Sequence, residues 1–196
     1  MSDKSLEERI RYRQEHSVDP EQFLLEAGAI EPTDEDEQLQ FRSAFASQVK
    51  ENLERFRQEG VDPSVVAGIF GVDEDDVEKV EREYVAFKIV YTVRSWPSEG
   101  ALEFDAATDA VLREESDRWE EVPPRQRYRI LQSLRSFQDV CFFCSGSIGV
   151  DDEPVDSCCT QRRVFRFYCS ECGRRFLEFS AESDSADAIG AISSGD

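Results

Sequence analysis

Two Cys-x-x-Cys pairs lie in the C-terminal third of this sequence, at Cys141 and Cys144 and again at Cys169 and Cys172. Two residues between paired cysteines let a tight turn direct both thiolates toward one point, and four thiolates complete the tetrahedral coordination that Zn²⁺ prefers. The spacing therefore predicts that these four cysteines bind one structural zinc ion. A closed site of this kind has no open position for a substrate, so it predicts metal binding and not catalysis.

The other general features of the chain fit a soluble protein with reduced thiols. The sequence has no apolar run of transmembrane length and no basic start followed by a short apolar segment. We therefore expect a cytoplasmic protein that does not contact membranes. Thiols stay reduced in the cytosol, so the six cysteines indicate metal chemistry before disulfides.

The formal net charge is −20, and lysine occurs only at Lys4, Lys50, Lys79 and Lys88. Abundant acidic residues with few lysines resemble the composition of proteins from extreme halophiles, especially haloarchaea; the alternative is an acidic mesophilic protein. In multi-molar salt the Debye length falls below about 3 Å. Long-range repulsion is then lost, so the net charge, which would normally argue against nucleic acid, does not exclude it.

Local signals predict several helices in the N-terminal part. Asp19 and Pro20 favour a helix start, because Asp caps free N–H groups and Pro fits the first turn. A long helix is expected within residues 33–59, after an acidic entry, and another over residues 104–119 with Asp105 as N-cap. The long helix has an apolar stripe at spacings of three and four, formed by Phe41, Phe45, Val49, Leu53 and Phe56.

Residues 63–82 resemble a helix-turn-helix, in which a small residue, a turn glycine and a β-branched residue follow one another at fixed spacing. Ala67, Gly71 and Val77 occupy these positions, and Gly71 permits the positive φ that such a turn requires. The second helix is expected to continue to about residue 91. Four of its six groove-facing positions are carboxylates, which repel phosphate. We therefore favour a helical pair used for folding or protein contact over one that reads DNA.

The sequence as a whole predicts an α+β protein. Residues 1–122 are expected to form a mostly helical domain, and Pro123 with Pro124 marks the boundary. Residues 123–180 are expected to contain a basic amphipathic helix over 125–139 and then a small β zinc ribbon. Residues 181–196 are small, acidic and polar, which predicts a disordered tail.

The region from Cys141 to Phe179 resembles zinc-ribbon modules common in haloarchaeal proteins, many of them uncharacterised. The resemblance implies that the four knuckle cysteines are the metal ligands. The linker between the knuckles also contains Cys158 and Cys159. Three interpretations of this pair stay open: one buried and one exposed thiol, a ligand exchange with a knuckle cysteine, or a vicinal disulfide.

The functional hypothesis is a non-enzymatic regulatory protein associated with DNA or RNA. Arginine pairs with phosphate through two N–H groups, and Phe165, Phe167 or Tyr168 are candidates to stack on bases. The alternative is a protein–protein adaptor with a structural zinc and no nucleic-acid binding. No nucleophile with a neighbouring base and no phosphate-binding loop is evident, so we expect no enzymatic activity. The basic residues of the C-terminal part are Arg125, Arg127, Arg129, Arg135, Arg162, Arg163, Arg166, Arg174 and Arg175.

Overall fold

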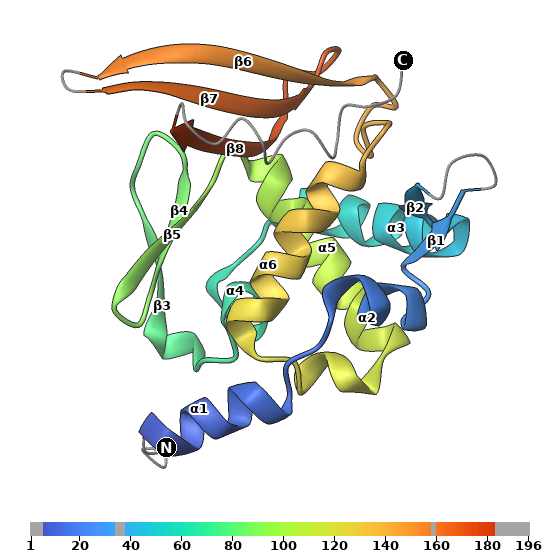
Figure 1. The fold of residues 1–196 in the computed structure, drawn as a ribbon, viewed down its shortest axis with the longest axis vertical. Helices are drawn as coiled ribbons and strands as arrows, with labels where there is room; N and C mark the ends of the chain where they lie inside the picture. Colours follow the sequence, from blue (N-terminus) through green and yellow to red (C-terminus); the bar gives the residue numbers. More distant parts are fainter. Residues whose placement is uncertain (1–5, 34–37, 158–159, 183–196) are drawn as a thin grey trace.

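The computed structural model describes residues 6–33, 38–157 and 160–182, and it confirms the α+β class (Figure 1). The α-helices are α1 (Leu6–Glu15), α2 (Pro20–Glu26), α3 (Ser43–Glu59), α4 (Pro63–Phe70), α5 (Glu99–Glu115) and α6 (Pro124–Leu134). Short 3-10 helices are η1 (Glu74–Asp76), η2 (Asp117–Glu120) and η3 (Arg135–Phe137). The strands are β1 (Ile30–Pro32), β2 (Leu39–Phe41), β3 (Val77–Val80), β4 (Val85–Ile89), β5 (Thr92–Trp96), β6 (Ile148–Ser157), β7 (Thr160–Cys169) and β8 (Arg175–Glu182).

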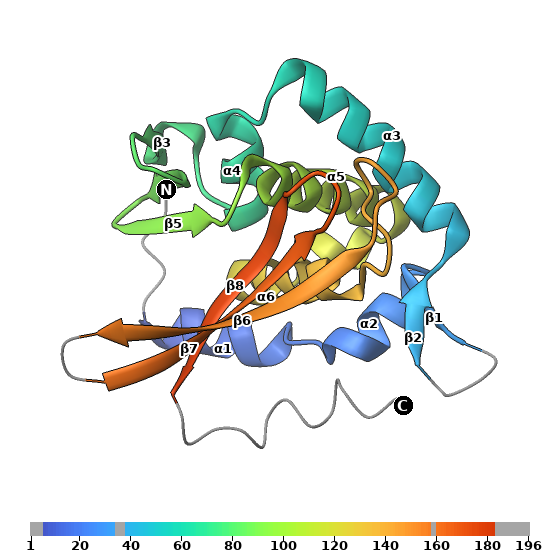
Figure 2. The same cartoon turned by 90° about the horizontal axis from the view of Figure 1, so that it is seen from above.

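Helices α3, α5 and α6 enclose the main core (Figures 1 and 2). The apolar stripe predicted on the long helix is the core face of α3, where four of its five members are buried: Phe45, Val49, Leu53 and Phe56. The helix is shorter than predicted and begins at Ser43, because residues 39–41 pair with residues 30–32 in an antiparallel hairpin. Within the described residues, no helix is long and apolar enough to cross a membrane.

The prediction of a second helix after Gly71, as in a helix-turn-helix, is wrong. Helix α4 and its left-handed C-terminal Gly71 are present, but the chain then forms the antiparallel sheet β3-β4-β5. The dense Val and Ile residues of this segment favour strands, since side chains branched at Cβ pack well on a pleated surface. Phe87 and Ile89 of β4 are buried in a second core, where Phe87 packs edge-on against Trp96 at 6.0 Å between ring centroids.

The N-cap predicted for the helix over residues 104–119 is also wrong. Helix α5 begins at Glu99, and the Ser98 side chain accepts a hydrogen bond from the backbone N–H of Ala101. Asp105 lies one to two turns inside the helix and is fully buried. The stretch before residue 104 is helical because Ser98 satisfies the free N–H groups at the start.

The C-terminal sheet has the order β6-β7-β8 and is antiparallel throughout. It lies across the ends of α5 and α6, and the β6 and β7 strands extend past the helices in both views (Figures 1 and 2). Strand β8 contacts α5 and η3. The basic helix predicted after Pro123 is α6 continued by η3. Residues 183–196 of the predicted tail and the Cys158–Cys159 pair lie outside the described residues.

Candidate metal centre

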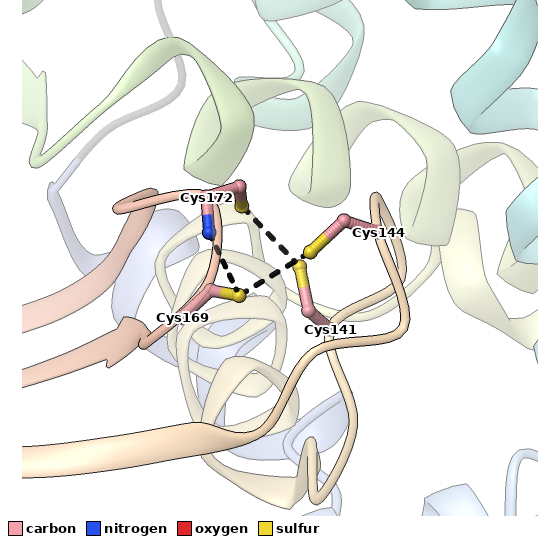
Figure 3. A group of neighbouring side chains, drawn as sticks. All are labelled: Cys141, Cys144, Cys169 and Cys172. Atoms are coloured by element: carbon pink, nitrogen blue, oxygen red, sulfur yellow. Dashed lines mark hydrogen bonds between the residues drawn. The ribbon is translucent and has the colours of Figure 1, made fainter.

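The structure brings the four knuckle cysteines together at one point (Figure 3). Their sulfur atoms all lie within 4.8 Å of one another. The Sγ atoms of Cys141 and Cys172 are 3.8 Å apart, and those of Cys144 and Cys169 are 3.4 Å apart. Cys141 and Cys169 are buried, whereas Cys144 is exposed. The cluster therefore joins the segment after η3 to the turn between β7 and β8.

Each knuckle is a tight turn closed by backbone hydrogen bonds. In the first, the Cys141 N–H donates to the carbonyl of Gly146 at 2.8 Å. In the second, the Cys169 N–H donates to the carbonyl of Arg174 at 2.9 Å. The residue after each second cysteine has a positive φ: 61° at Ser145 and 68° at Gly173. The two turns thus present their cysteine pairs with the same local geometry.

The donor set fits a tetrahedral metal ion. Zn–S bonds of about 2.3 Å in a tetrahedron place the sulfur atoms roughly 3.8 Å apart, close to the observed separations. Without a cation the thiols do not ionise together: burial raises the pKa of Cys141 to about 12. Desolvation also opposes ionisation of Cys172, but hydrogen bonds from the backbone and side chain of Arg174 lower its pKa to about 6. A bound divalent cation would supply the charge that four neighbouring thiolates need.

The two residues between the first cysteine pair anchor the centre to the helices. Phe142 packs edge-on against Phe41 and Phe104, at centroid distances of 5.5 Å and 5.3 Å. Phe143 lies 6.0 Å from the buried ring of Phe176 on β8. Both rings border the main core, so the first knuckle is part of the packing of the helical region.

A buried ion pair forms a second link. Arg135 of η3 donates through Nε to Asp105 Oδ1 at 2.7 Å and through Nη2 to Asp105 Oδ2. The indole N–H of Trp96 donates to Asp105 Oδ2 at 2.8 Å. Arg135 Nη1 also donates to the carbonyl of Phe176 at 3.2 Å. The Arg135–Asp105 pair therefore joins η3, α5, β5 and β8 next to the second knuckle.

Two of the arginines predicted to contact nucleic acid are buried, so that prediction is wrong for them. Arg135 belongs to the ion pair just described, and Arg127 is only 4% exposed. Burial lowers the pKa of Arg127, and its guanidinium lies over Gly71 at the C-terminal end of α4. Arg113 donates to the carbonyl of Gly68 at the same helix end, at 2.8 Å. Arg113 therefore satisfies a carbonyl at the negative end of α4, and the buried Arg127 lies beside the same helix end.

The arginines on the C-terminal sheet are paired within the chain. Arg163 pairs with Asp152, whereas Arg166 and Arg175 both lie within salt-bridge distance of Glu178, at 3.3 and 3.5 Å. The side chain of Arg162 lies outside the described residues.

Two further arginines of the predicted set lie on α6. Arg125 and Arg129 are exposed, one helical turn apart. Among the residues that the structure describes, neither has an ion pair.

The C-terminal sheet has an exposed apolar face that was not predicted from the sequence, although Phe165 and Phe167 were predicted to stack on bases. Register places Val150, Phe167 and Leu177 side by side, and Phe165 beside Phe179. The rings of Phe165 and Phe179 stack at 5.3 Å, yet Phe179 is 43% and Val150 60% exposed. We call these five residues the aromatic face. The alternation of aromatic and charged residues along β7 was the sequence signal that could have predicted this face. The same alternation places Tyr168 on the opposite face of the sheet.

An open groove of about 930 Å³ lies between the β3–β4 turn and the starts of α5 and β8. Lys79 Nζ lies 3.9 Å from a carboxylate oxygen of Glu99 within it. Because cations and carboxylates are interspersed, the groove does not present a field of one sign. Its charged lining residues are Lys79, Glu81, Arg82, Glu83, Glu99 and Arg175.

Two family models match the chain. Residues 19–136 match the model described as "Family of unknown function (DUF8054) central domain", and residues 139–179 match the corresponding C-terminal domain. The second match contains the four-cysteine cluster. No curated protein and no solved structure matches the chain significantly. Since the central-domain match alone covers more than half of the 196 residues, the protein belongs to the DUF8054 family.

Proposed function

We propose that this protein is a non-enzymatic adaptor in which Cys141, Cys144, Cys169 and Cys172 hold one structural Zn²⁺. Four thiolates complete a tetrahedron and leave no position for a substrate or an activated water, which supports a structural role for the metal. When bound, the ion would stabilise the two knuckles and hold β7 and β8 against the first knuckle. The zinc-ribbon resemblance of this region supports the choice of zinc.

The observation that carries the proposal is the aromatic face. Its five residues are neighbours by register across three strands, and the rings of Phe165 and Phe167 both stack on Phe179. None of the five belongs to a buried core of the described residues. A contiguous exposed apolar patch on a soluble protein marks an interaction surface. Aromatic residues are enriched at the centres of protein interfaces, where they bury large areas at small entropic cost.

The paired arginines support a protein partner over nucleic acid. Arg163, Arg166 and Arg175 already contact carboxylates, so a phosphate would have to replace these partners. The charge of −20 adds repulsion for any polyanion at low salt. The same acidic composition supports the further proposal that the protein functions at high salt in a halophile.

Site-specific photocrosslinking tests the adaptor function. Phe179 would be replaced by p-benzoylphenylalanine, which keeps an aromatic ring at the position, and the full chain would be irradiated in cells. The control carries the same group at Tyr91, which is 95% exposed in the turn between β4 and β5. We expect a discrete protein adduct at position 179 and none at position 91. Absence of any adduct at 179, or an equal pattern at both positions, would contradict the adaptor proposal.

Nucleic-acid association in a regulatory role is the second candidate, and Arg125 with Arg129 is the observation that favours it. Two exposed guanidinium groups one turn apart on α6 can contact neighbouring phosphates. Fluorescence anisotropy with labelled DNA and RNA, in high KCl, measures this directly. Saturable binding that falls at least about tenfold in the double variant Arg125→Gln/Arg129→Gln would support it. Lack of binding by the wild-type chain would remove this candidate.

A further inference from the structure

Arg174 stands apart from the other arginines of the C-terminal sheet because it contacts the cysteine cluster. It follows Cys172 and Gly173 in the second knuckle, and its carbonyl accepts the hydrogen bond that closes this turn. Its side chain reaches the first knuckle, where the guanidinium lies over the ring of Phe143. The neighbouring Arg175 instead contacts Glu178. Two consecutive arginines therefore have different environments.

The Arg174 side chain is held on two sides. Its guanidinium carbon lies 4.6 Å from the centre of the Phe143 ring, within range of a cation–π contact. Its stem passes close to Gly100 in the first turn of α5: a Cβ at that position would lie 2.8 Å from Arg174 Cδ. The absence of a side chain at Gly100 thus creates the space that Arg174 occupies.

The position of the Arg174 guanidinium affects the charge balance of the site if four thiolates surround a divalent cation. Such a centre retains a net charge of about −2. In a chain that already carries −20, a fixed cation held against the first knuckle offsets part of that charge. Groups around metal-bound ligands orient them and adjust the properties of the metal.

We propose that Arg174 is a positioning residue of the metal centre, which links the two knuckles and places a compensating cation beside the four-sulfur site. The inference rests on the proposed metal site but not on the adaptor function. It assigns to Arg174 a role different from the phosphate contact predicted from the sequence. Gly100 and Phe143 support that role by fixing the path of the side chain.

The test uses the full chain loaded with Zn²⁺ or with Co²⁺ as a spectroscopic probe. Arg174→Met keeps much of the stem and removes the guanidinium, and Arg175→Met is the matched control. We expect the Arg174 variant to bind Zn²⁺ at least about tenfold more weakly in competition with a chromophoric chelator. Its sulfur-to-cobalt charge-transfer band should move to lower energy, because thiolates without a nearby cation donate electrons more readily. The control should match the wild type in both measurements.

Gly100→Ala provides an independent variant. It leaves Arg174 in the chain but places a methyl group where the stem passes, and alanine is favourable in a helix. The cobalt band should move in the same direction as in Arg174→Met. A variant that merely loosened packing would lower stability without moving this band. Wild-type affinity within about twofold and an unchanged band in both variants would overturn the assignment. If no variant, nor the wild type, bound metal, the proposed metal site itself would fail instead.

Discussion

The buried pair of Asp105 and Arg135 offers a sharp test of how the structure is held together. Asp105 is fully buried and Arg135 is 2% exposed, so neither charge has access to water. Asp105 also accepts from the indole of Trp96, and Arg135 donates to the carbonyl of Phe176. Replacing one member leaves the opposite charge buried and uncompensated.

The expected magnitudes follow from this arrangement. Asp105→Leu and Arg135→Met should each lower the free energy of unfolding by about 3–5 kcal/mol, the typical cost of breaking a buried pair. For a chain of this length that corresponds to a fall in Tm of about 6–20 °C. The double variant removes both charges, and replacing a buried pair by apolar groups is often nearly neutral. We therefore expect a coupling energy of roughly 3 kcal/mol or more in the double-mutant cycle.

Urea unfolding followed by circular dichroism, at constant KCl and with Zn²⁺ in constant excess, measures these free energies. Constant metal matters because a bound ion adds to the apparent stability. The control is Arg163→Met, which breaks the pair with Asp152 at an exposed site, where the side chains are 58% and 37% exposed. This change should cost less than about 1 kcal/mol. The reasoning would be refuted if either single variant lost as little free energy of unfolding as Arg163→Met, or if the losses of the two single variants simply added in the double variant.

Three other predictions follow from single positions or from the composition. In Gly146→Ala the new Cβ would clash with the Glu171 side chain and lie 3.1 Å from Cys169 Sγ, so metal affinity in a chelator competition should fall. In Gly173→Ala no atom lies within 4 Å of the new Cβ, so this change should cost only about 1–2 kcal/mol of backbone strain. Raising KCl from low concentration to several molar should raise the Tm, because it screens the repulsion of a chain with charge −20; a Tm that does not change with salt would contradict this. Burial raises the pKa of Tyr128 above its usual value of 10.0, so the folded state holds this proton longer than the unfolded state and stability should fall as the pH rises above about 10. That alkaline loss should be smaller in Tyr128→Phe, and equal pH profiles for the two proteins would disprove the link.

The features that could be predicted from the sequence are those encoded within a few residues. The cysteine spacing predicted a cluster because two short turns suffice to converge the thiols, and the structure brings them within 4.8 Å. The start of α2 was predicted correctly, since the Asp19 side chain accepts from the backbone N–H of Gln22. The stripe on α3 was predictable because its members recur with the helical period.

The segment that follows Gly71 could not be assigned from local pattern alone. Its apolar residues are so dense that they satisfy both a helical and an alternating period. The outcome depends on tertiary packing: Phe87 and Ile89 are buried in a core that includes Trp96 and Ala101. A strand propensity that depends on such neighbours is a weak signal in an isolated sequence.

The roles of the arginines were hidden for a related reason. A basic residue in a sequence suggests a solvent-exposed charge, but Arg135 contacts a carboxylate 30 residues away, and Arg174 contacts α5 through Gly100. Both roles depend on partners that only the fold brings close. In an acidic chain, a phosphate contact can therefore be predicted for an arginine only when the fold shows which partner its side chain already has.

The contacts between the two family-matched regions argue that they fold as one cooperative unit. Phe142 lies in the second region but packs against Phe41 and Phe104 of the first. Arg135 belongs to the first region, yet it donates to a carbonyl of β8. The Ser98 hydroxyl donates to the carbonyl of Arg175 at 2.5 Å, beside the second knuckle. Since removal of the metal would free the first knuckle and with it Phe142, the loss should extend into the helical core. A calorimetric scan of the metal-free chain should then show one transition at a lower temperature, and two separate transitions would show that the regions are independent.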